Sequence, residues 1–407
     1  MKQVMWLCLV ICAGQVFATT IPPSKATMSQ SKYTTKELVT NLNSPWALKV
    51  DKNGRFWVTE KLGTLVIVEA DLQQQRLDLQ LPDLYPAGQG GLLDIILLDP
   101  PKLTNQTEPY RKIHNQNTDI SEYQSIILSY AKGTAQANAL TIAKLDLVKT
   151  SKYEESGQWQ VAEYSEIFQI SPKKSSPVHY AGRMLLLPDN TLLVNSGDGF
   201  DWREDAQRLT SLLGKTLRMT LSGAIPSDNP FSEEEDIAQR YVYSYGHRNA
   251  QGLTLGPGGT VWQHEHGPAG GDEINILAPR VNYGWPVITY GKDYSGAQIS
   301  PFTEYADMRQ PEVQWTPSIA PSAMLYQGPT DRYPELANSL LVTSLKYRRL
   351  HSVKLPASNL GFRHYNDIII DMNVSERIRD ISHHTEGDIL LLTDGENAKI
   401  MQLLPVR

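Results

Sequence analysis

The chain repeats one pattern: a turn of Pro, Asp, Asn or Gly residues, then a short apolar strand that ends near a Thr or a small residue. The turn at residues 51–54 leads into the strand 56–59, and the turn at 386–387 leads into the strand 389–393. Each of these strands is preceded by another apolar segment, such as residues 46–50. Strand–turn–strand units with this density of turn residues predict antiparallel β-structure.

Six such units can be counted from their first strands. A β-propeller closes radially and leaves only short sheet edges, so it accommodates repeated units of this kind in one chain. We therefore predict an all-β fold, a six-bladed β-propeller with antiparallel four-stranded blades; a two-sheet sandwich is the alternative, but 407 residues are many for one. The first strands begin near Trp46, Gly91, Gly182, Gln251, Ala323 and Arg379.

Two segments depart from the strand pattern. Residues 101–123 are polar and poor in branched side chains, which predicts a surface loop inserted in the second unit. Residues 205–213 form a short stretch that suggests a helical turn. No low-complexity linker divides residues 19–407, so we predict that they form a single domain.

The N-terminal segment predicts export. Lys2 is followed by an apolar run and then by residues 16–18, which suit a cleavage site. This predicts a signal peptide at residues 1–18, because the run is too short for a membrane span; a membrane anchor is the weaker alternative. We expect a periplasmic or secreted protein with no membrane span after cleavage. Ile11 before Cys12 is bulky for a lipoprotein site, and lipidation of Cys12 stays open.

Composition excludes several classes of site. Both cysteines, Cys8 and Cys12, lie in the predicted signal peptide, so the remaining chain has no thiol or disulfide. Any metal must therefore be held by oxygen or imidazole ligands. The net charge is −6 and no basic cluster is present, which argues against nucleic-acid binding. The sequence does not distinguish a monomer from a homodimer.

The segment between residues 247 and 286 carries the densest set of polar groups. It places the Arg248-Asn249 pair near the Gly267-Pro268 turn and the carboxylate of Glu273. Guanidinium, amide and carboxylate groups beside tight turns suit an anionic, oxygen-rich ligand held together with a hard cation, which takes carboxylate and carbonyl oxygens.

Six short motifs occur in a fixed order along the units: residues 88–94 (GQGGLLD), 179–183 (HYAGR), 248–249 (RN), 315–322 (WTPSIAPS), 344–346 (SLK) and 377–380 (RIRD). With these motifs the chain resembles the soluble aldose sugar dehydrogenases that depend on pyrroloquinoline quinone (PQQ), of the glucose/sorbosone dehydrogenase family. The resemblance covers about Leu42 to the C-terminus. It implies an oxidoreductase that oxidises aldose sugars at the anomeric carbon, passes hydride to PQQ and delivers electrons to an external acceptor.

The resemblance also implies a cofactor site. PQQ brings an ortho-quinone and three carboxylates, while the protein supplies binding and orientation. The matching cations are Arg377, Arg379 and Lys346, and a guanidinium can hold a carboxylate through two hydrogen bonds. The i, i+2 spacing of the arginines puts both on one face of a strand. The alternative is that they are surface charges on that strand, without a role in binding. Gln89 and Asn249 are the matching amides.

His179 is the predicted general base, because the pKa of a histidine lies near working pH. The resemblance implies that Asp198 orients this imidazole and that Arg248 contacts the cofactor and stabilises negative charge on the reacting oxygen. A lone histidine is more often structural, but the neighbouring motif favours a functional role. The spacing of His264 and His266 suggests zinc, a weaker interpretation since catalytic zinc normally has three protein ligands.

Calcium is implied at two places. The backbone carbonyls of Gly267 and Pro268 match those that hold the cofactor-bound ion, which acts as a Lewis acid on the quinone. A second, structural ion would take six to eight oxygens, some from the backbone. Its implied protein ligands are Glu273, Tyr283 and either Asp293 or Tyr294.

Three departures from the family pattern leave the physiological sugar open, and the electron acceptor stays open too. Val178 stands where some glucose-oxidising members carry an acid, Ala250 replaces a frequent proline, and residues 200–208 do not match the sugar-contacting loop of the best glucose enzymes. Two other classes remain. A non-catalytic secreted propeller that binds a glycan or a protein would not need His179 together with the cationic set. A calcium-dependent lactonase would hold a single ion mainly by side chains.

Overall fold

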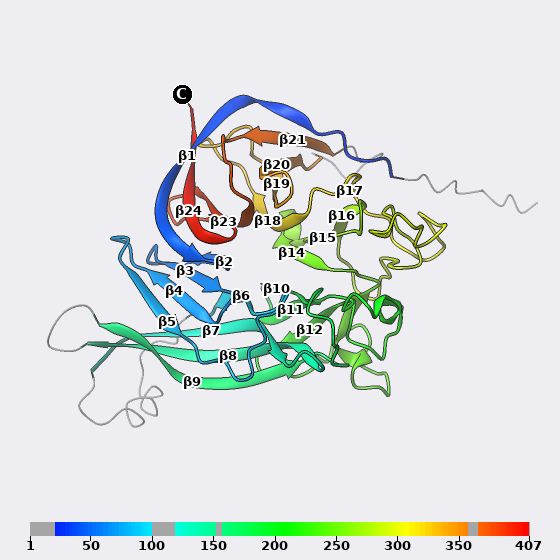
Figure 1. Cartoon of the computed structure of the whole chain (residues 1–407), viewed down its shortest axis with the longest axis horizontal. Coiled ribbons are helices and arrows are strands. Elements are labelled where there is room, and N and C mark those ends of the chain that lie inside the picture. Colours follow the sequence, from blue (N-terminus) through cyan, green and yellow to red (C-terminus); the bar gives the residue numbers. More distant parts are fainter. Residues whose placement is uncertain (1–20, 100–118, 152–156, 357–364, 407) are drawn as a thin grey trace, which may run out of the picture.

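The computed structural model describes residues 21–99, 119–151, 157–356 and 365–406, and these form a six-bladed β-propeller (Figure 1). The fold predicted from the repeat pattern is confirmed. One strand of each blade lies against the axis, next to the corresponding strands of the two neighbouring blades. The axial strands are β2 (Pro45–Val50), β6 (Leu92–Leu97), β10 (Ala181–Leu186), β14 (Ala250–Leu255), β18 (Pro321–Gln327) and β22 (Ile378–His383).

Each axial strand begins within two residues of the position predicted for it. The chain then runs outward through each blade by antiparallel hairpins. The second strands are β3 (Phe56–Glu60), β7 (Asp119–Gly133), β11 (Thr191–Ser196), β15 (Val261–Glu265), β19 (Ser339–Ser344) and β23 (Ile389–Thr393). The third strands are β4 (Thr64–Val68), β8 (Asn138–Ser151), β12 (Lys215–Thr220), β16 (Asp272–Ile276), β20 (Arg349–Lys354) and β24 (Glu396–Pro405).

The outer strand of the sixth blade comes from the other end of the chain. β1 (Thr27–Asn43) pairs antiparallel with β24 and wraps the outside of that blade in Figure 1. It also makes a short parallel pairing with the fifth blade, so the two blades share an eight-stranded sheet. The ring is thus closed by hydrogen bonds between the two ends of the chain. The other outer strands are β5 (Gln74–Asp78), β9 (Gln158–Gln169), β13 (Val242–Tyr245), β17 (Val313–Trp315) and β21 (Asn366–Asp371).

The second blade carries the longest hairpin, formed by β7, β8 and β9, which extends beyond the ring (Figure 1). The predicted loop 101–123 is wrong at its end, because residues 119–123 form the beginning of β7, which pairs with β8. The rest of that loop up to residue 118, like the predicted signal peptide, lies outside the described residues. The helical turn predicted at residues 205–213 is present only in its first part, as the short 3₁₀ helix η2 (Arg203–Gln207). Two further 3₁₀ helices within the described residues are η3 (Gln239–Tyr241) and η4 (Pro257–Gly259).

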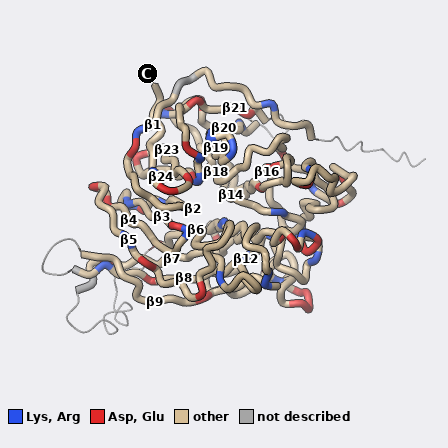
Figure 2. The backbone as a smooth tube through the Cα atoms, in the orientation of Figure 1, with Lys and Arg blue, Asp and Glu red and all other residues tan. Residues whose placement is uncertain are grey.

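Apolar side chains fill the spaces between neighbouring blades. Strands such as β3 and β23 are buried along their whole length, because each blade is covered on both faces. Trp57 of the first blade and Trp159 of the second pack edge to face, with ring centroids 5.3 Å apart. Acidic and basic positions are interspersed over the blades (Figure 2). No helix in the described ranges is long and apolar enough to cross a membrane.

One buried arginine fills the axis of the ring. Arg183 of β10 is 3% exposed, and its Nη1 lies 3.4 Å from a carboxylate oxygen of Asp94 and 3.4 Å from one of Asp380. Its Nε donates to the carbonyl of Gln251 at 2.8 Å, and its Nη2 donates to that of Ser322 at 3.3 Å. These partners belong to β6, β22, β14 and β18. We call Arg183, Asp94 and Asp380 the axial hub.

The first blade joins the axial hub through three contacts. The ring of Trp46 lies 4.2 Å from the guanidinium carbon of Arg183, and the backbone N–H of Leu48 donates to Asp380 at 2.7 Å. Lys49, with its Nζ 3.8 Å from Asp94, balances the second carboxylate. All six blades therefore meet at one guanidinium, and the charges around it cancel.

Candidate active site

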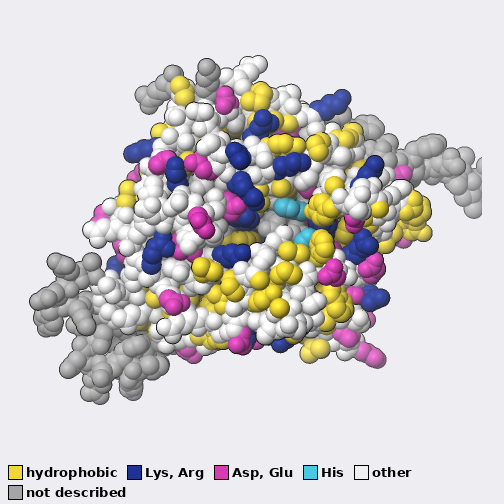
Figure 3. All heavy atoms as spheres, in the orientation of Figure 1, with side chains coloured by type: hydrophobic (Ala, Val, Ile, Leu, Met, Phe, Trp, Pro, Cys, Tyr) yellow, Lys and Arg dark blue, Asp and Glu magenta, His cyan; other side chains and the backbone are white. Residues whose placement is uncertain are grey.

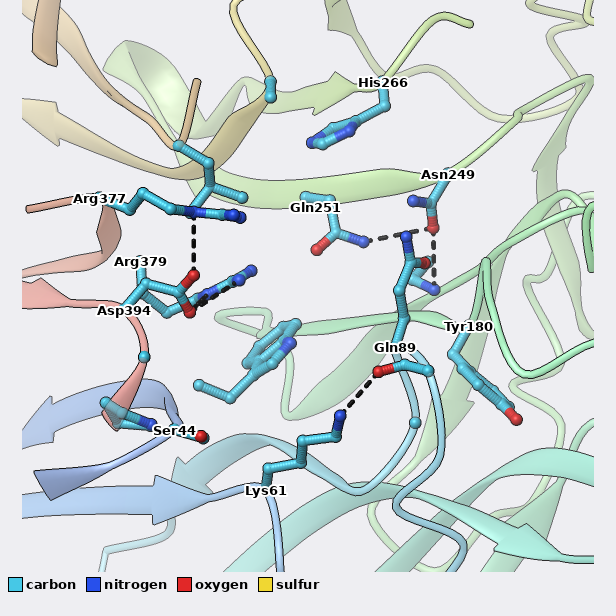
Figure 4. Close-up of a pocket in the computed structure, with 18 residues that line it drawn as sticks. Ser44, Lys61, Gln89, Tyr180, Asn249, Gln251, His266, Arg377, Arg379 and Asp394 are labelled. Atoms are coloured by element: carbon cyan, nitrogen blue, oxygen red, sulfur yellow. Dashed lines mark hydrogen bonds and ion pairs between the residues drawn. The ribbon is translucent and has the colours of Figure 1, made fainter. Parts of the chain in front are cut away.

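A cavity of about 460 Å³ opens at the end of the axis where the axial strands begin. Figure 3 shows this hollow with basic and histidine side chains at its edge, and Figure 4 shows its lining. Trp46 forms part of the lining and separates the cavity from the axial hub. Every blade contributes to the wall, through Trp46, Gln89, Ala181, Asn249, Ala320 and Arg379.

Much of the lining comes from two positions of a blade. One is the start of the axial strand. The other, in the first, fourth, fifth and sixth blades, is the residue that follows the second strand, because an antiparallel hairpin brings these two points together. In the sixth blade Ile378 pairs with Thr393, which sets Arg377 opposite Asp394. In the first blade Lys61 follows β3 in the same way.

The charged side chains that line the cavity carry a net positive charge. Lys61, Arg377 and Arg379 are cationic, and Asp394 is the single carboxylate among the described residues of the lining. Arg379 donates to one oxygen of Asp394 through Nε at 3.0 Å and Nη2 at 2.9 Å, while Nε of Arg377 lies 3.1 Å from the other oxygen (Figure 4). Burial lowers the pKa of Arg379, and Asp394 opposes that shift. Both predicted arginines thus face one cavity, which carries an excess of positive charge.

The opposite wall presents amide donors. The Oδ1 of Asn249 accepts hydrogen bonds from the N–H of Ala181 at 3.1 Å and from the amide of Gln251 at 3.2 Å. The Oε1 of Gln89 accepts from the N–H of His179 at 2.8 Å. Since both carbonyl oxygens are engaged, both NH₂ groups are left to donate, and no protein partner for them lies within the described residues. Amide donors and surplus cations together fit a ligand with several carboxylates.

His179 lies beside the cavity, in a cleft that shares Gln89 with it. Its Nδ1 is 2.7 Å from Asp198, whose other oxygen accepts from the indole N–H of Trp285 at 2.8 Å. Asp198 therefore fixes the tautomer with the proton on Nδ1 and leaves the lone pair on Nε2, which has no partner in the described part of the chain. His179 itself has a backbone φ of 55°, a sparsely populated conformation for a non-glycine residue.

The electrostatics of this pair suit proton transfer. Burial lowers the pKa of His179 below its ordinary value, as do the charges of Arg248 and Lys174, although the hydrogen bond to Asp198 opposes the shift. Burial alone would raise the pKa of Asp198, but its hydrogen bond and attraction to His179 outweigh this and keep the carboxyl ionised. His179 is consequently neutral at neutral pH, as a base must be, and Asp198 stabilises its charged form.

Lys174 supports the segment before His179. Its buried ammonium donates to the carbonyls of Ser176 and Val178, the latter at 2.8 Å, and lies 3.6 Å from the ring centroid of Tyr180. Burial lowers the pKa of Lys174 from 10.5 to about 7, although the charge of Asp198 opposes this. These hydrogen bonds fix the backbone segment that precedes the predicted base.

Arg248 is buried between two aromatic rings, with its guanidinium 5.3 Å from Trp285 and 6.0 Å from Tyr294. Its Nη1 donates to the carbonyls of His266 at 3.1 Å and Gly267 at 2.9 Å, and its Nη2 is 3.5 Å from the hydroxyl of Tyr294. The side chain is therefore held in one position between the cleft and the turn that contains Gly267.

A second, much smaller cavity of about 10 Å³ lies behind Arg248. The carboxylates of Glu265 and Glu273 line it, together with Gly267 and Tyr283. Burial raises the pKa of Glu273 well above its ordinary value, and the charge of Glu265 adds to that effect. The volume matches the ~10–15 Å³ that holds a single water-sized particle. Two close carboxylates in such a space fit a hard cation such as calcium.

The predicted calcium ligands do not all meet there. Glu273 and Tyr283 line the small cavity, but the hydroxyl of Tyr283 already donates to a backbone carbonyl at 2.6 Å. The carboxylate of Asp293 lies outside it and bonds Ser295, whereas Tyr294 lines the cleft of His179. The carbonyl of Gly267, predicted for the cofactor-bound ion with that of Pro268, accepts a hydrogen bond from Arg248. Glu265 was missed by sequence reasoning.

Two further predictions can be compared with the structure. The side chain of Lys346 is exposed, with its Nζ 5.2 Å from the ring of Tyr347, although Leu345 next to it lines the large cavity. His266 lines that cavity and donates through Nε2 to the carbonyl of Pro321 at 2.6 Å, while His264 is fully buried. Among the described residues the one group of three close metal-ligating side chains lies at the 384–388 turn instead.

Sequence reasoning also missed residues that become functional neighbours only in the folded blades. Asp394 and Lys61 could have been found from the register of the first hairpin in each blade, as described above. Trp285, which bonds Asp198, carries no local signal, because its partner lies in another segment of the chain. The partners of Lys174 are local, but the sequence does not show that its ammonium is buried against them.

Comparison with known proteins agrees with the fold. Residues 42–402 match the glucose/sorbosone dehydrogenase family. The chain belongs to this family. As a member of this group of PQQ-type sugar dehydrogenases, it shares the oxidoreductase class of the family.

Three relatives of this family member are informative. The aldose sugar dehydrogenase of Escherichia coli K12 is 30% identical over 368 residues, covering 89% of this chain and 91% of that protein. Quinoprotein glucose dehydrogenase B of Acinetobacter calcoaceticus is 27% identical over 442 residues, covering 92% and 88%. The PQQ-bound aldose sugar dehydrogenase of Streptomyces coelicolor superposes with a TM-score of 0.67 at 25% identity, covering 92% of this chain and 99% of that one.

Proposed function

We propose that the protein is a PQQ- and calcium-dependent dehydrogenase that oxidises aldose sugars at the anomeric carbon and passes the electrons to an external acceptor. The observation that carries this proposal is the large cavity, whose three cations face one carboxylate and amide donors, directly beside the His179–Asp198 pair. The names of the relatives support the same activity. We also propose export to the periplasm or the medium, on the basis of residues 1–18.

In this proposal one group of residues binds the cofactor. Arg377, Arg379 and Lys61 bind the carboxylates of the cofactor, and the amides of Gln89 and Asn249 orient it. When bound, PQQ supplies the hydride acceptor, and calcium supplies a Lewis acid beside it.

A second group of residues, around His179, activates the sugar. His179 accepts the proton of the anomeric hydroxyl at Nε2, while Asp198 stabilises the imidazolium that forms. Arg248 is fixed near the reacting oxygen, where its charge favours the developing negative charge. The indole N–H of Trp285 holds Asp198 so that the imidazole keeps its orientation.

Reconstitution tests this proposal directly. Purified protein stripped of ligands should oxidise glucose in a dye-linked assay only after PQQ and calcium are both added, and PQQ should bind at micromolar concentration or tighter. Absence of turnover at saturating PQQ and calcium, across a panel of aldoses, would contradict the enzyme proposal. If lactone hydrolysis with calcium alone were observed instead, the lactonase alternative would be correct.

A further inference from the structure

The two sides of the cavity mouth expose different kinds of surface. Figure 3 shows Lys and Arg side chains gathered on the side of the hollow toward the fifth and sixth blades, and a largely apolar surface on the opposite side. The apolar side belongs to the cleft of His179, whose described lining contains the carboxylate of Asp201 and neither Lys nor Arg. Because the proposed reaction places the sugar beside His179, the basic side is left for another partner.

The basic side is built on the turn between β19 and β20. Ser344 pairs with Arg349, and Leu345 at the beginning of the turn lines the large cavity. The four residues that follow are all exposed: Lys346, Tyr347, Arg348 and Arg349. The N–H of Tyr347 donates to the hydroxyl of Ser344 at 3.1 Å, which fixes the turn. Three cationic side chains are thus presented to solvent directly beside the cavity.

The three cations of this turn have no acidic partner in the part of the chain that the structure describes. Two of them lie near the ring of Tyr347, with Nζ of Lys346 at 5.2 Å and the guanidinium carbon of Arg349 at 5.8 Å. In the sequence they are too few to form a basic cluster, but the fold adds Lys61 and Arg377, which line the same cavity as Leu345. On a chain of net charge −6, this is a local excess of positive charge.

Exposed apolar groups accompany these cations. Tyr347 is 38% exposed, and Leu62, which follows Lys61 in the first blade, is 63% exposed. Protein interfaces are enriched in Tyr and Arg, and their charged groups steer a partner of opposite charge into place. A small anion would need only the cations, whereas cations together with exposed apolar side chains suit a protein surface. We call Lys61, Leu62 and residues 346–349 the basic rim.

We propose that the basic rim docks the external electron acceptor, and that this acceptor is a small acidic redox protein. This inference rests on the proposed function and names its partner. Each aldose oxidised to its lactone releases two electrons and two protons, so two molecules of a one-electron carrier are reduced per sugar while the protons pass to solvent. Asp201 repels an acidic protein from the cleft of His179, so the sugar and the acceptor approach from different sides.

The test uses one acceptor protein in two charge states. Mitochondrial cytochrome c is a basic one-electron carrier, and succinylation of its lysines replaces ammonium groups with carboxylates and makes it acidic. At saturating aldose, PQQ and calcium and about 10 mM salt, the second-order rate constant for reduction should be about 10–100-fold higher for the succinylated form. The difference should disappear at about 500 mM salt, where charges on the surface are screened.

Two double variants of equal charge locate the docking surface. Arg348→Gln/Arg349→Gln should lower the rate constant for succinylated cytochrome c by about 3–10-fold at low salt and leave the reduction of benzoquinone, a small neutral acceptor, unchanged. The control Lys36→Gln/Lys52→Gln removes two exposed charges elsewhere, from β1 and from the turn between β2 and β3 at the opposite end of the ring. It should keep the rate constant close to that of the parent.

Equal rate constants for the two forms of cytochrome c, or for the Arg348 and Arg349 double variant and the parent, would overturn the inference and leave the dehydrogenase proposal intact. Binding of succinylated cytochrome c to ligand-free protein, measured by interferometry at low salt, needs no turnover. Binding that this double variant weakens and the control does not, in a protein that oxidises no aldose, would sink the proposed function and support the docking surface. Binding to vesicles of anionic phospholipid but to neither cytochrome would assign the basic rim to a membrane surface and overturn the inference.

Discussion

The charged side chains of the axial hub and those that line the large cavity lie on either side of Trp46. The two groups differ in how far the protein itself neutralises their charge. In the hub, Arg183 and Lys49 face Asp94 and Asp380, so the protein itself neutralises every charge. In the cavity, three cations face Asp394 alone. A buried charge that the protein balances holds the fold together, whereas a surplus of one sign suits a ligand of the other sign. The comparison predicts that hub variants lose stability and cavity variants lose function.

The largest expected effect is on turnover, in His179→Gln. Removal of a positioned base should lower kcat by ~10²–10⁴-fold at saturating cofactor. The free energy of unfolding should change by less than ~1 kcal/mol, because the glutamine amide can still donate to Asp198. Steady-state kinetics and urea unfolding measure the two quantities. His384→Gln, in the turn that follows β22, is the control. A turnover within a few-fold of the parent in His179→Gln would assign the base elsewhere.

Arg183→Met should have the largest effect on stability. It removes a guanidinium that all six blades contact and leaves Asp94 and Asp380 buried without it, which costs ~3–5 kcal/mol when a buried pair is broken. Arg377→Met is the matched control, since Arg377 is half exposed and should cost less than ~1 kcal/mol. Chemical denaturation gives the free energy of unfolding of both variants. A similar decrease in the two proteins would contradict the distinction between hub and cavity.

Lys174→Met should change how stability depends on pH. Burial lowers the pKa of Lys174 from 10.5 to about 7. Between these values the unfolded chain binds a proton that the folded chain has largely released, so the free energy of unfolding rises with pH, by up to ~1.4 kcal/mol per unit. The contribution is flat below pH 7 and above pH 10.5. Unfolding at pH 7, 8 and 9 should show a smaller rise in Lys174→Met, and identical slopes would mean that the lysine is not perturbed.

The smallest effect is expected for Lys346→Met. The ammonium is exposed at the rim of the cavity, so a contact with the cofactor would be well solvated, and its loss should weaken PQQ binding by only about 3–10-fold. A PQQ titration of the variant checks this. A loss as large as that for Arg379 would show that the lysine moves into the cavity when the cofactor binds.

Local patterns in the sequence were sufficient for the fold and for part of the site. The turn-and-strand repeat predicted six blades, and the i, i+2 spacing of Arg377 and Arg379 placed both on one wall. Neither pattern contained β1, because that strand completes the last blade from the other end of the chain. Asp394 meets Arg377 through the register of one hairpin, which the sequence pattern did not specify. The partners of Arg183 come from separate blades, so these contacts need the closed ring.

The central claim, that the surplus charge of the cavity binds the cofactor, is tested most directly by titrating ligand-free protein with PQQ in the parent and in Arg379→Met, with urea unfolding of both ligand-free proteins in parallel. Loss of one charge-assisted partner of a buried carboxylate costs roughly 2–5 kcal/mol, so the dissociation constant should rise by about 30-fold to several thousand-fold. The free energy of unfolding should change by less than ~1 kcal/mol. Unchanged PQQ affinity together with a stability loss like that of Arg183→Met would contradict the claim, because Arg379 would then belong to the structural charges of the axis.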